Sequence, residues 1–145
     1  MHVAGILASK GADVATVAPE ATVAEAVASL QRHGIGALVV SADGRHIEGI
    51  ISERDVVRCL AEIGGDALER PVADLMTAEV RTCRPGDRVD TLMAAMTEHR
   101  IRHLPVVDDE GVLVGIVSIG DVVKHRVQEL EHEQQQLIEY VRTGR

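Results

Sequence analysis

The 145-residue chain contains no tryptophan, no phenylalanine and one tyrosine, Tyr140. Stacking of bases on aromatic rings, the usual way to hold single-stranded nucleic acid, is therefore not available. Positive charge is also scarce, because 15 Lys and Arg stand against 23 Asp and Glu, for a formal net charge of −8. Nucleic-acid backbones require a positive surface, so nucleic acid is not an expected partner.

Cysteine is limited to Cys59 and Cys83, which do not form a C-x-x-C pair. We expect two reduced, unpaired thiols, as is usual in the cytosol. No apolar run is long enough to cross a bilayer, and the N-terminus has no signal-peptide pattern. The sequence therefore predicts a cytoplasmic protein that does not associate with membranes.

Motifs for metal binding and catalysis are also missing. The seven histidines and two cysteines form no cluster with metal-ligand spacing, so we predict no metal site. The chain has no Walker loop, no G-x-G-x-x-G motif and no evident pairing of a nucleophile with a base. His103 is the one histidine near a candidate serine, and it serves one site only. We therefore predict that the protein is not an enzyme.

The sequence does contain an internal repeat. Residues 14–57 align with residues 80–123 without a gap, and sixteen of the 44 positions are identical. The clearest match pairs Gly-Ile-Ile-Ser-Glu-Arg-Asp at 49–55 with Gly-Ile-Val-Ser-Ile-Gly-Asp at 115–121. Such a repeat is one supersecondary unit made twice. Each unit is too small to be stable alone, so we expect the pair to form one body with its sites at the seam.

Hydrophobic periodicity predicts the order β-α-β-β-α in both copies. The fold class is α+β, with α/β-like character: two pseudo-twofold-related βαββα repeats form one compact module, followed by an extended C-terminal helix. The expected boundaries are 1–66, 67–127 and 128–145. Strands are expected at 14–17, 37–40, 47–51, 80–82, 104–107 and 112–117. Helices are expected at 3–7, from Thr22 to His33, from Ser52 to about Ile63, at 72–76, after a cap at Asp87, and from Ser118 onward.

An apolar stripe continues past the second copy. Val127, Leu130, Leu137 and Val141 recur at helical spacing in a segment rich in Glu and Gln. Two interpretations stay open at this point. The final helix packs on its own domain, or its stripe forms a homodimer contact.

The repeated Gly-Ile-x-Ser-x-x-Asp motif carries the candidate chemistry. A serine followed three residues later by an acid is a helix-capping box and needs no ligand to explain it. However, Ser52 and Ser118 each follow a strand and open a helix, where an anion is favoured. The glycine of each motif lies inside a strand, which indicates a close approach by backbone or ligand. Asp55 and Asp121 could accept hydrogen bonds from both hydroxyls of a ribose.

The segment Arg-Ile-Arg-His-Leu-Pro-Val-Val-Asp at 100–108, followed by the motif at 115–121, is very similar to the signature of cystathionine-β-synthase (CBS) domains. The resemblance covers roughly residues 1–128, as a tandem pair called a Bateman module. It implies a regulatory module that senses an adenosine nucleotide, AMP, ATP or NAD(H), in clefts between the repeats. It implies no covalently bound cofactor, a homodimer, and an unidentified downstream protein. The alternative is a dimerisation scaffold whose clefts are degenerate.

Carried over to this chain, the resemblance implies that Asp55 and Asp121 each hold a ribose. Asp121 is expected to share a pocket with Ala18, Ile35 and Ala37, and Asp55 with Arg84 and Ile101. The full set of expected ligand-binding residues is Thr16, Ala18, Ile35, Gly36, Ala37, Ser52, Arg54, Asp55, Thr82, Arg84, Ile101, Arg102, His103, Ile116, Ser118 and Asp121.

The two copies differ in charge. Arg102 and His103 stand where the first copy has Gly36 and Ala37, so cations for phosphate are concentrated in the second copy. For Arg100, which aligns with a glycine, a solvated helix end and a phosphate contact are both open. The sequence leaves open whether the two clefts bind the same ligand.

Overall fold

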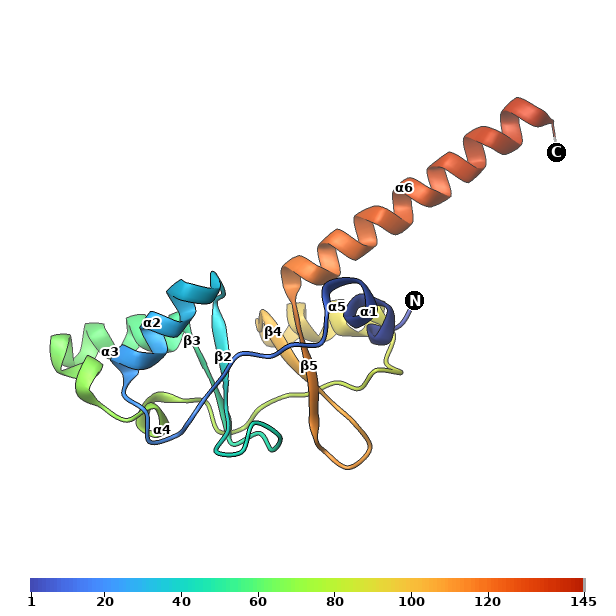
Figure 1. Cartoon of the computed structure of the whole chain (residues 1–145). Coiled ribbons are helices and arrows are strands. Elements are labelled where there is room, and N and C mark those ends of the chain that lie inside the picture. The colour runs from blue at the N-terminus through green and yellow to red at the C-terminus, as the bar shows by residue number, and fades with distance from the viewer. Residues whose placement is uncertain (145) are drawn as a thin grey trace.

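The structure is a computed structural model that describes residues 1–144. It is 53% helical and 19% strand, as the α+β prediction requires. Two halves lie side by side, and the last helix projects away from the second half (Figure 1). The elements in chain order are α1 (Val3–Lys10), β1 (Thr16–Val17), α2 (Val23–His33), β2 (Ala37–Val40), β3 (Gly49–Ser52), α3 (Glu53–Ile63), a 3-10 helix (Gly64–Glu69), α4 (Val72–Leu75), α5 (Val89–His99), β4 (His103–Val107), β5 (Leu113–Ser118) and α6 (Ile119–Thr143).

The first half contains a three-stranded sheet in the order β1-β2-β3. β1 runs parallel to β2, with Thr16 opposite Val39, and β2 runs antiparallel to β3, with Ala37 opposite Ser52. Every residue of β2 is buried, which explains its unbroken apolar sequence. The core around this sheet is formed by Val23, Ala26, Leu30, Leu38, Val40, Ile51, Val56 and Val72.

The second half repeats the hairpin but not the first strand. β4 and β5 pair antiparallel, and a single parallel bridge joins Cys83 to Val106. The predicted strand at 80–82 is therefore wrong. In the first half the N–H of Val39 donates to the carbonyl of Ala15, whereas the position equivalent to Val39 is Pro105. Proline has no N–H, so this ladder bond cannot form in the second half.

The start of α5 also departs from the prediction. Asp87 does not cap this helix; the N-cap position is Arg88, which makes no side-chain capping bond. The Asp87 carboxylate instead accepts a hydrogen bond from the N–H of Arg84 and closes the turn before the helix. Capping boxes are present at Thr22, Ser52 and Ser118.

The two halves exchange their leading helices. The sequence predicts that the helix at 3–7 leads into the first unit, but α1 packs in the second half, where Val3 and Ile6 are buried in its core. The N–H groups of Val3 and Ala4 donate to carbonyls of the turn at 85–87. Conversely, α4 packs in the first half, where Val72 is buried. Figure 1 shows α1 beside β5 and α5, on the far side from α2 and α3.

The glycine of each repeated motif makes room for this exchange. A Cβ on Gly49 would lie 2.5 Å from Sδ of Met76 and 2.9 Å from the carbonyl oxygen of Thr77. A Cβ on Gly115 would lie 2.7 Å from a methyl group of Leu7. The close neighbour that these strand glycines indicate is therefore the leading segment and not a ligand.

The final helix extends well past the body of the molecule. Val122 is buried against the second half, but every described residue after Leu130 is exposed. Leu137 is 63% exposed and Val141 is 72% exposed. Of the two interpretations of the apolar stripe, packing on its own domain does not hold for this segment.

Candidate functional site

The repeated motifs lie at one edge of each sheet because of the strand register. Ala37 faces Ser52 at the end of one antiparallel ladder, and His103 faces Ser118 at the end of the other. The segments before β2 and β4 therefore meet the Ser-x-x-Asp turns that follow β3 and β5. Two cavities lie at these edges, and each is lined by residues of both halves.

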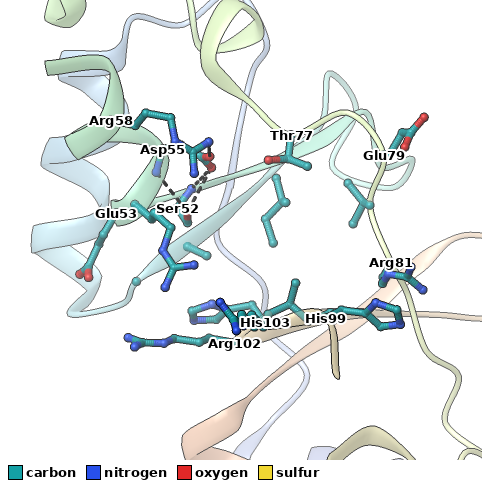
Figure 2. Close-up of a pocket in the computed structure, with 17 residues that line it drawn as sticks. Ser52, Glu53, Asp55, Arg58, Thr77, Glu79, Arg81, His99, Arg102 and His103 are labelled. Carbon is teal, nitrogen blue, oxygen red and sulfur yellow. Dashed lines mark hydrogen bonds and ion pairs between the residues drawn. The ribbon is translucent and has the colours of Figure 1, made fainter. Parts of the chain in front are cut away.

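The larger cavity has a volume of about 520 Å³. Figure 2 shows Ser52 and Asp55 on one wall and Arg102 and His103 on the opposite wall. Its lining residues are Gly36, Ala37, Ile50, Ser52, Glu53, Arg54, Asp55, Arg58, Thr77, Glu79, Val80, Arg81, His99, Arg100, Ile101, Arg102 and His103.

Asp55 uses only part of its carboxylate in the helix cap. Its Oδ2 accepts hydrogen bonds from the N–H of Ser52 at 2.9 Å and from the Ser52 hydroxyl at 3.1 Å. Its Oδ1 lies 4.0 Å from a guanidinium nitrogen of Arg58, beyond hydrogen-bond distance. The side chain is 10% exposed. One oxygen of a largely buried carboxylate is therefore available to accept hydrogen bonds from a ligand.

The walls of the larger cavity carry more positive than negative side chains. Five arginines stand against three carboxylates, a balance of +2 before any charge on the two histidines. Such a surface suits an anionic group, and arginine can bind phosphate oxygens in a bidentate manner. The arginines are Arg54, Arg58, Arg81, Arg100 and Arg102, and the acids are Glu53, Asp55 and Glu79.

Arg100 occupies a backbone position that favours glycine. Its φ is 54°, and within residues 1–144 it is the one non-glycine residue with positive φ. The equivalent residue in the first half is Gly34, with φ 63°. An L-residue in this left-handed conformation costs about 1–2 kcal/mol. An arginine held there at the wall of a charged cavity is a candidate for function.

The smaller cavity has a volume of about 280 Å³, and Asp121 is the one carboxylate in its lining. The N–H of Ser118 donates to Asp121 Oδ2 at 2.9 Å, and Nζ of Lys10 donates to the same oxygen at 2.6 Å. Lys10 Nζ also donates to the carbonyl of Ile116 at 2.9 Å. The lining residues are Lys10, Val14, Ala15, Gly34, Ile35, Gly36, Ala37, His103, Ile116, Ser118 and Asp121.

Two side chains of the smaller cavity have shifted pKa values. Burial opposes ionisation of Asp121, but hydrogen bonds from Lys10 and Ser118 outweigh it and hold the pKa of this carboxyl below its ordinary value. Burial lowers the pKa of His103, and the positive charge of Lys10 lowers it further. The free cavity therefore contains an ionised Asp121 and favours a neutral imidazole.

His103 lies between the two cavities and lines both. Its Cε1 is 3.4 Å from where a Cβ of Gly36 would stand. The imidazole of the second half is therefore packed over a glycine of the first half. Gly36 and Ala37 are the other residues shared by the two linings.

The structure brings most of the predicted site residues to these cavities. Ile101, Ser52, Arg54 and Arg102 lie with Asp55, and Ile35, Ile116 and Ser118 lie with Asp121. Gly36, Ala37 and His103 lie with both. Four predicted residues do not line either cavity: Thr16, Ala18, Thr82 and Arg84. Thr16 is opposite Val39, two residues along from the edge at Ala37, so Val14 and Ala15 take the expected place.

Arg84 is directed elsewhere. Its guanidinium pairs with Asp109 at 2.8 Å in an exposed ion pair. Lys10 is the main residue that sequence reasoning missed, because it lies outside the repeat and its helix was expected beside the first unit. The only sequence feature that could have indicated Lys10 is its place as a basic residue at the end of an apolar helix.

Within residues 1–144, no group of three or more His, Cys, Asp or Glu could hold a metal ion, and no helix could cross a membrane.

Comparisons with known proteins agree with the repeat. The family model described as CBS domain matches twice, at residues 5–62 and 72–128. A mitochondrial CBS domain-containing protein of Arabidopsis thaliana is 42% identical over 127 residues, which cover 85% of this chain and 61% of that protein. The chain thus spans less than two thirds of that relative.

Solved structures extend the comparison. A CBS-domain containing protein from Agrobacterium tumefaciens is 45% identical, with a TM-score of 0.83, covering 87% of this chain and 99% of that one. A CBS domain protein from Pyrobaculum aerophilum complexed with AMP is 27% identical, with a TM-score of 0.75 and coverages of 83% and 89%. A CBS domain pair in complex with 5′-methylthioadenosine and S-adenosyl-L-methionine, from the protein MJ0100, is 26% identical, with a TM-score of 0.79 and coverages of 89% and 98%.

Proposed function

The chain belongs to the CBS-domain family, and from this premise we propose that it is a regulatory module that binds an adenosine nucleotide in the two clefts between its repeats. The candidate ligands are AMP, ATP and NAD(H). Occupancy of the clefts is then read by another protein.

The observation that carries the proposal is the duplicated acid. Asp55 and Asp121 stand at equivalent positions, each at a cavity lined by both halves. Each gives Oδ2 to the cap of its helix. Among the described residues, the hydrogen bonds to the Asp121 carboxylate all reach Oδ2, and Oδ1 of Asp55 has only Arg58, at 4.0 Å. These oxygens can accept hydrogen bonds from the vicinal hydroxyls of a ribose.

The charge of the larger cleft supports a phosphorylated ligand. Its wall carries an excess of arginine, and Arg102 lies across the cavity from Asp55 (Figure 2). A ribose at Asp55 would leave its phosphate within the arginine-rich part of the cavity. Similar proteins were solved in complex with AMP, or with methylthioadenosine and S-adenosylmethionine, and these three ligands share an adenosine moiety. The arginines favour the anionic member of this set.

Regulation accounts for the site better than catalysis. The Ser52 hydroxyl donates to Asp55, and the Ser118 hydroxyl accepts the N–H of Asp121. Each hydroxyl serves a helix cap with the acid of its own motif, and among the described residues neither is hydrogen-bonded to a histidine that could activate it as a nucleophile. The contacts of both serines are those of helix caps, which favours binding over catalysis at this site.

The exposed stripe of α6 favours a homodimer. Val127, Leu130, Ile138 and Val141 are each between 43% and 72% exposed on one long helix. A continuous apolar stripe on a projecting helix is characteristic of an interaction surface. A second copy of the same helix would cover it with matching apolar side chains.

Isothermal titration with AMP, ATP, NAD and NADH tests the proposal. At least one of them should bind, and Asp121→Asn and Asp55→Asn should each weaken one class of sites by about tenfold or more, because a hydrogen bond to a charged group contributes about 1.5–3 kcal/mol. Arg102→Ala should weaken AMP more than adenosine. Absence of binding by all four nucleotides would leave the dimerisation scaffold as the function.

A further inference from the structure

We propose that Lys10 determines the ligand specificity of the smaller cleft. With Lys10 present, the cleft binds adenosine ligands that carry a phosphate more tightly than neutral or cationic adenosine ligands. The inference rests on the proposed function and concerns the same site. Neither the repeat nor its motif includes Lys10.

The position of Lys10 is fixed by the exchanged helix. Val3 and Ile6 bury one face of α1 in the second half, and Leu7 packs against Gly115. Lys10 ends this helix, and its ammonium reaches Asp121 Oδ2 and the carbonyl of Ile116. The side chain is 32% exposed, so the ion pair lies at the mouth of the cavity and is partly withdrawn from water.

Lys10 is hydrogen-bonded to the Asp121 carboxylate that a ribose would need. A hydroxyl that approaches Asp121 must share the carboxylate with an ammonium 2.6 Å away or displace it. A neutral ligand such as adenosine offers the displaced ammonium no new anion. A phosphate offers such an anion. The Lys10 ammonium has three hydrogens but only two acceptors among the described residues, so one hydrogen is available for a phosphate oxygen. Phosphate can therefore gain a contact from Lys10 without breaking both existing ones.

The charge balance of the cleft makes Lys10 decisive. Its charged lining residues are Lys10 and Asp121, for a balance of zero, and the pKa of His103 is lowered so that its neutral form is favoured. Without Lys10 the cleft would carry one carboxylate and would repel a phosphate. The larger cleft, with five arginines, does not depend on any single cation in this way.

The same charge disfavours a cationic ligand. S-adenosylmethionine carries a sulfonium on the carbon that bears the phosphate in AMP. With the ribose at Asp121, the ammonium of Lys10, 2.6 Å from that carboxylate, opposes a second positive charge on the ligand. We therefore expect the small cleft to prefer AMP over adenosine, and adenosine over S-adenosylmethionine.

Calorimetry in an Asp55→Asn background tests the inference, because this substitution weakens the larger cleft and leaves the smaller one intact. Lys10→Met should lower the affinity for AMP by about tenfold or more, since a charge-assisted contact to the phosphate is lost. The affinity for adenosine should stay the same or rise. Lys10→Arg keeps the charge and should retain the preference for AMP. Lys10→Gln provides the same comparison as Lys10→Met if the methionine variant does not fold.

The outcomes separate the two claims. If the Asp55→Asn protein binds neither AMP nor adenosine, nucleotide binding by the small cleft is refuted, and the role of Lys10 with it. If it binds both, and Lys10→Met changes their affinities by the same factor or not at all, nucleotide binding stands and the role of Lys10 is refuted. If Lys10→Met lowers the affinity for AMP and not that for adenosine, both nucleotide binding by the small cleft and the role of Lys10 are supported.

Discussion

Nζ of Lys10 lies 2.6 Å from Oδ2 of Asp121, although 111 positions of sequence separate them. The contact ties the end of α1 to the first turn of α6. It also joins the exchanged helix to the acid of the second motif, so that an element outside the repeat controls the charge of a site inside it.

The pH dependence of stability reports this contact. The pKa of Asp121 lies below 3.8, so the ionised carboxylate contributes stability above that pH, and the contribution is lost as the pH falls through the folded-state pKa. Lys10→Met should raise the Asp121 pKa, as measured by carboxyl-carbon NMR, and move acid unfolding to higher pH. Arg126→Met, which removes an exposed partner of Glu129, is the control and should not change the Asp121 pKa. An unaltered pKa in Lys10→Met contradicts the contact.

His103 should titrate below its ordinary value of 6.5 because of burial and the charge of Lys10. A lowered folded-state pKa means that its contribution to stability is complete above pH 6.5 and declines as the pH falls toward the folded pKa. Binding of AMP should raise the pKa of His103, because a nearby phosphate favours the imidazolium. NMR titration of the imidazole with and without AMP measures both values. A midpoint at or above 6.5 in the free protein would be the contrary result.

The two strand glycines should differ in their tolerance of alanine. At Gly49 the added methyl group would meet the backbone carbonyl of Thr77, which cannot easily move, so Gly49→Ala should destabilise by about 1–3 kcal/mol. At Gly115 its nearest neighbours would all be side-chain atoms of Leu7, which can rotate, so the cost should be about 1 kcal/mol or less. Urea unfolding of both variants provides the comparison. Equal costs would mean that the leading segments are not packed as described.

Replacement of Arg100 by glycine should make the fold more stable and ligand binding weaker. Arg100→Gly relieves the left-handed strain and should stabilise the fold by about 1 kcal/mol, while it weakens AMP in the larger cleft. Arg100→Lys keeps both the charge and the strain, and should match the wild type in stability. Thermal unfolding and calorimetry measure the two effects. If Arg100→Gly leaves AMP affinity unchanged, Arg100 is only a solvated helix end.

The stripe on α6 should govern assembly. Leu130→Glu together with Leu137→Glu places charge on the exposed apolar face and should shift a dimer to a monomer in light scattering. Gln135→Glu adds charge to another face of the helix and should leave the assembly unchanged. A chain that ends at Val127 should also be monomeric. Persistence of the dimer in both cases would assign the contact to another surface.

The sequence predicted the elements that follow from local patterns. The capping boxes at Thr22, Ser52 and Ser118, the hairpins and the long last helix depend on residues close together in the chain, and the structure has them. It mispredicted the strand at 80–82 because the absence of an N–H at Pro105 acts on a neighbour more than twenty residues away. Asp87 resembled a cap by spacing but bonds within its own turn.

The candidate clefts were predictable only in part. The duplicated motif identified Asp55 and Asp121, and the strand register places their neighbours at 35–37 and 101–103 beside them. The position of β1 relative to β2 was not predictable to within two residues, so Val14 and Ala15 were missed in favour of Thr16 and Ala18. Lys10 depends on the exchange of α1, which no periodicity in the sequence encodes.

The exchange of leading helices also sets an order of events during synthesis. Residues 15–76 contain every residue of the first core, so all of its contacts become possible before the second half is synthesised. Val3 and Ile6 must wait until residues 83–122 have left the ribosome before they find their partners. In the interval the apolar face of α1 has none of its native neighbours and stays exposed to solvent.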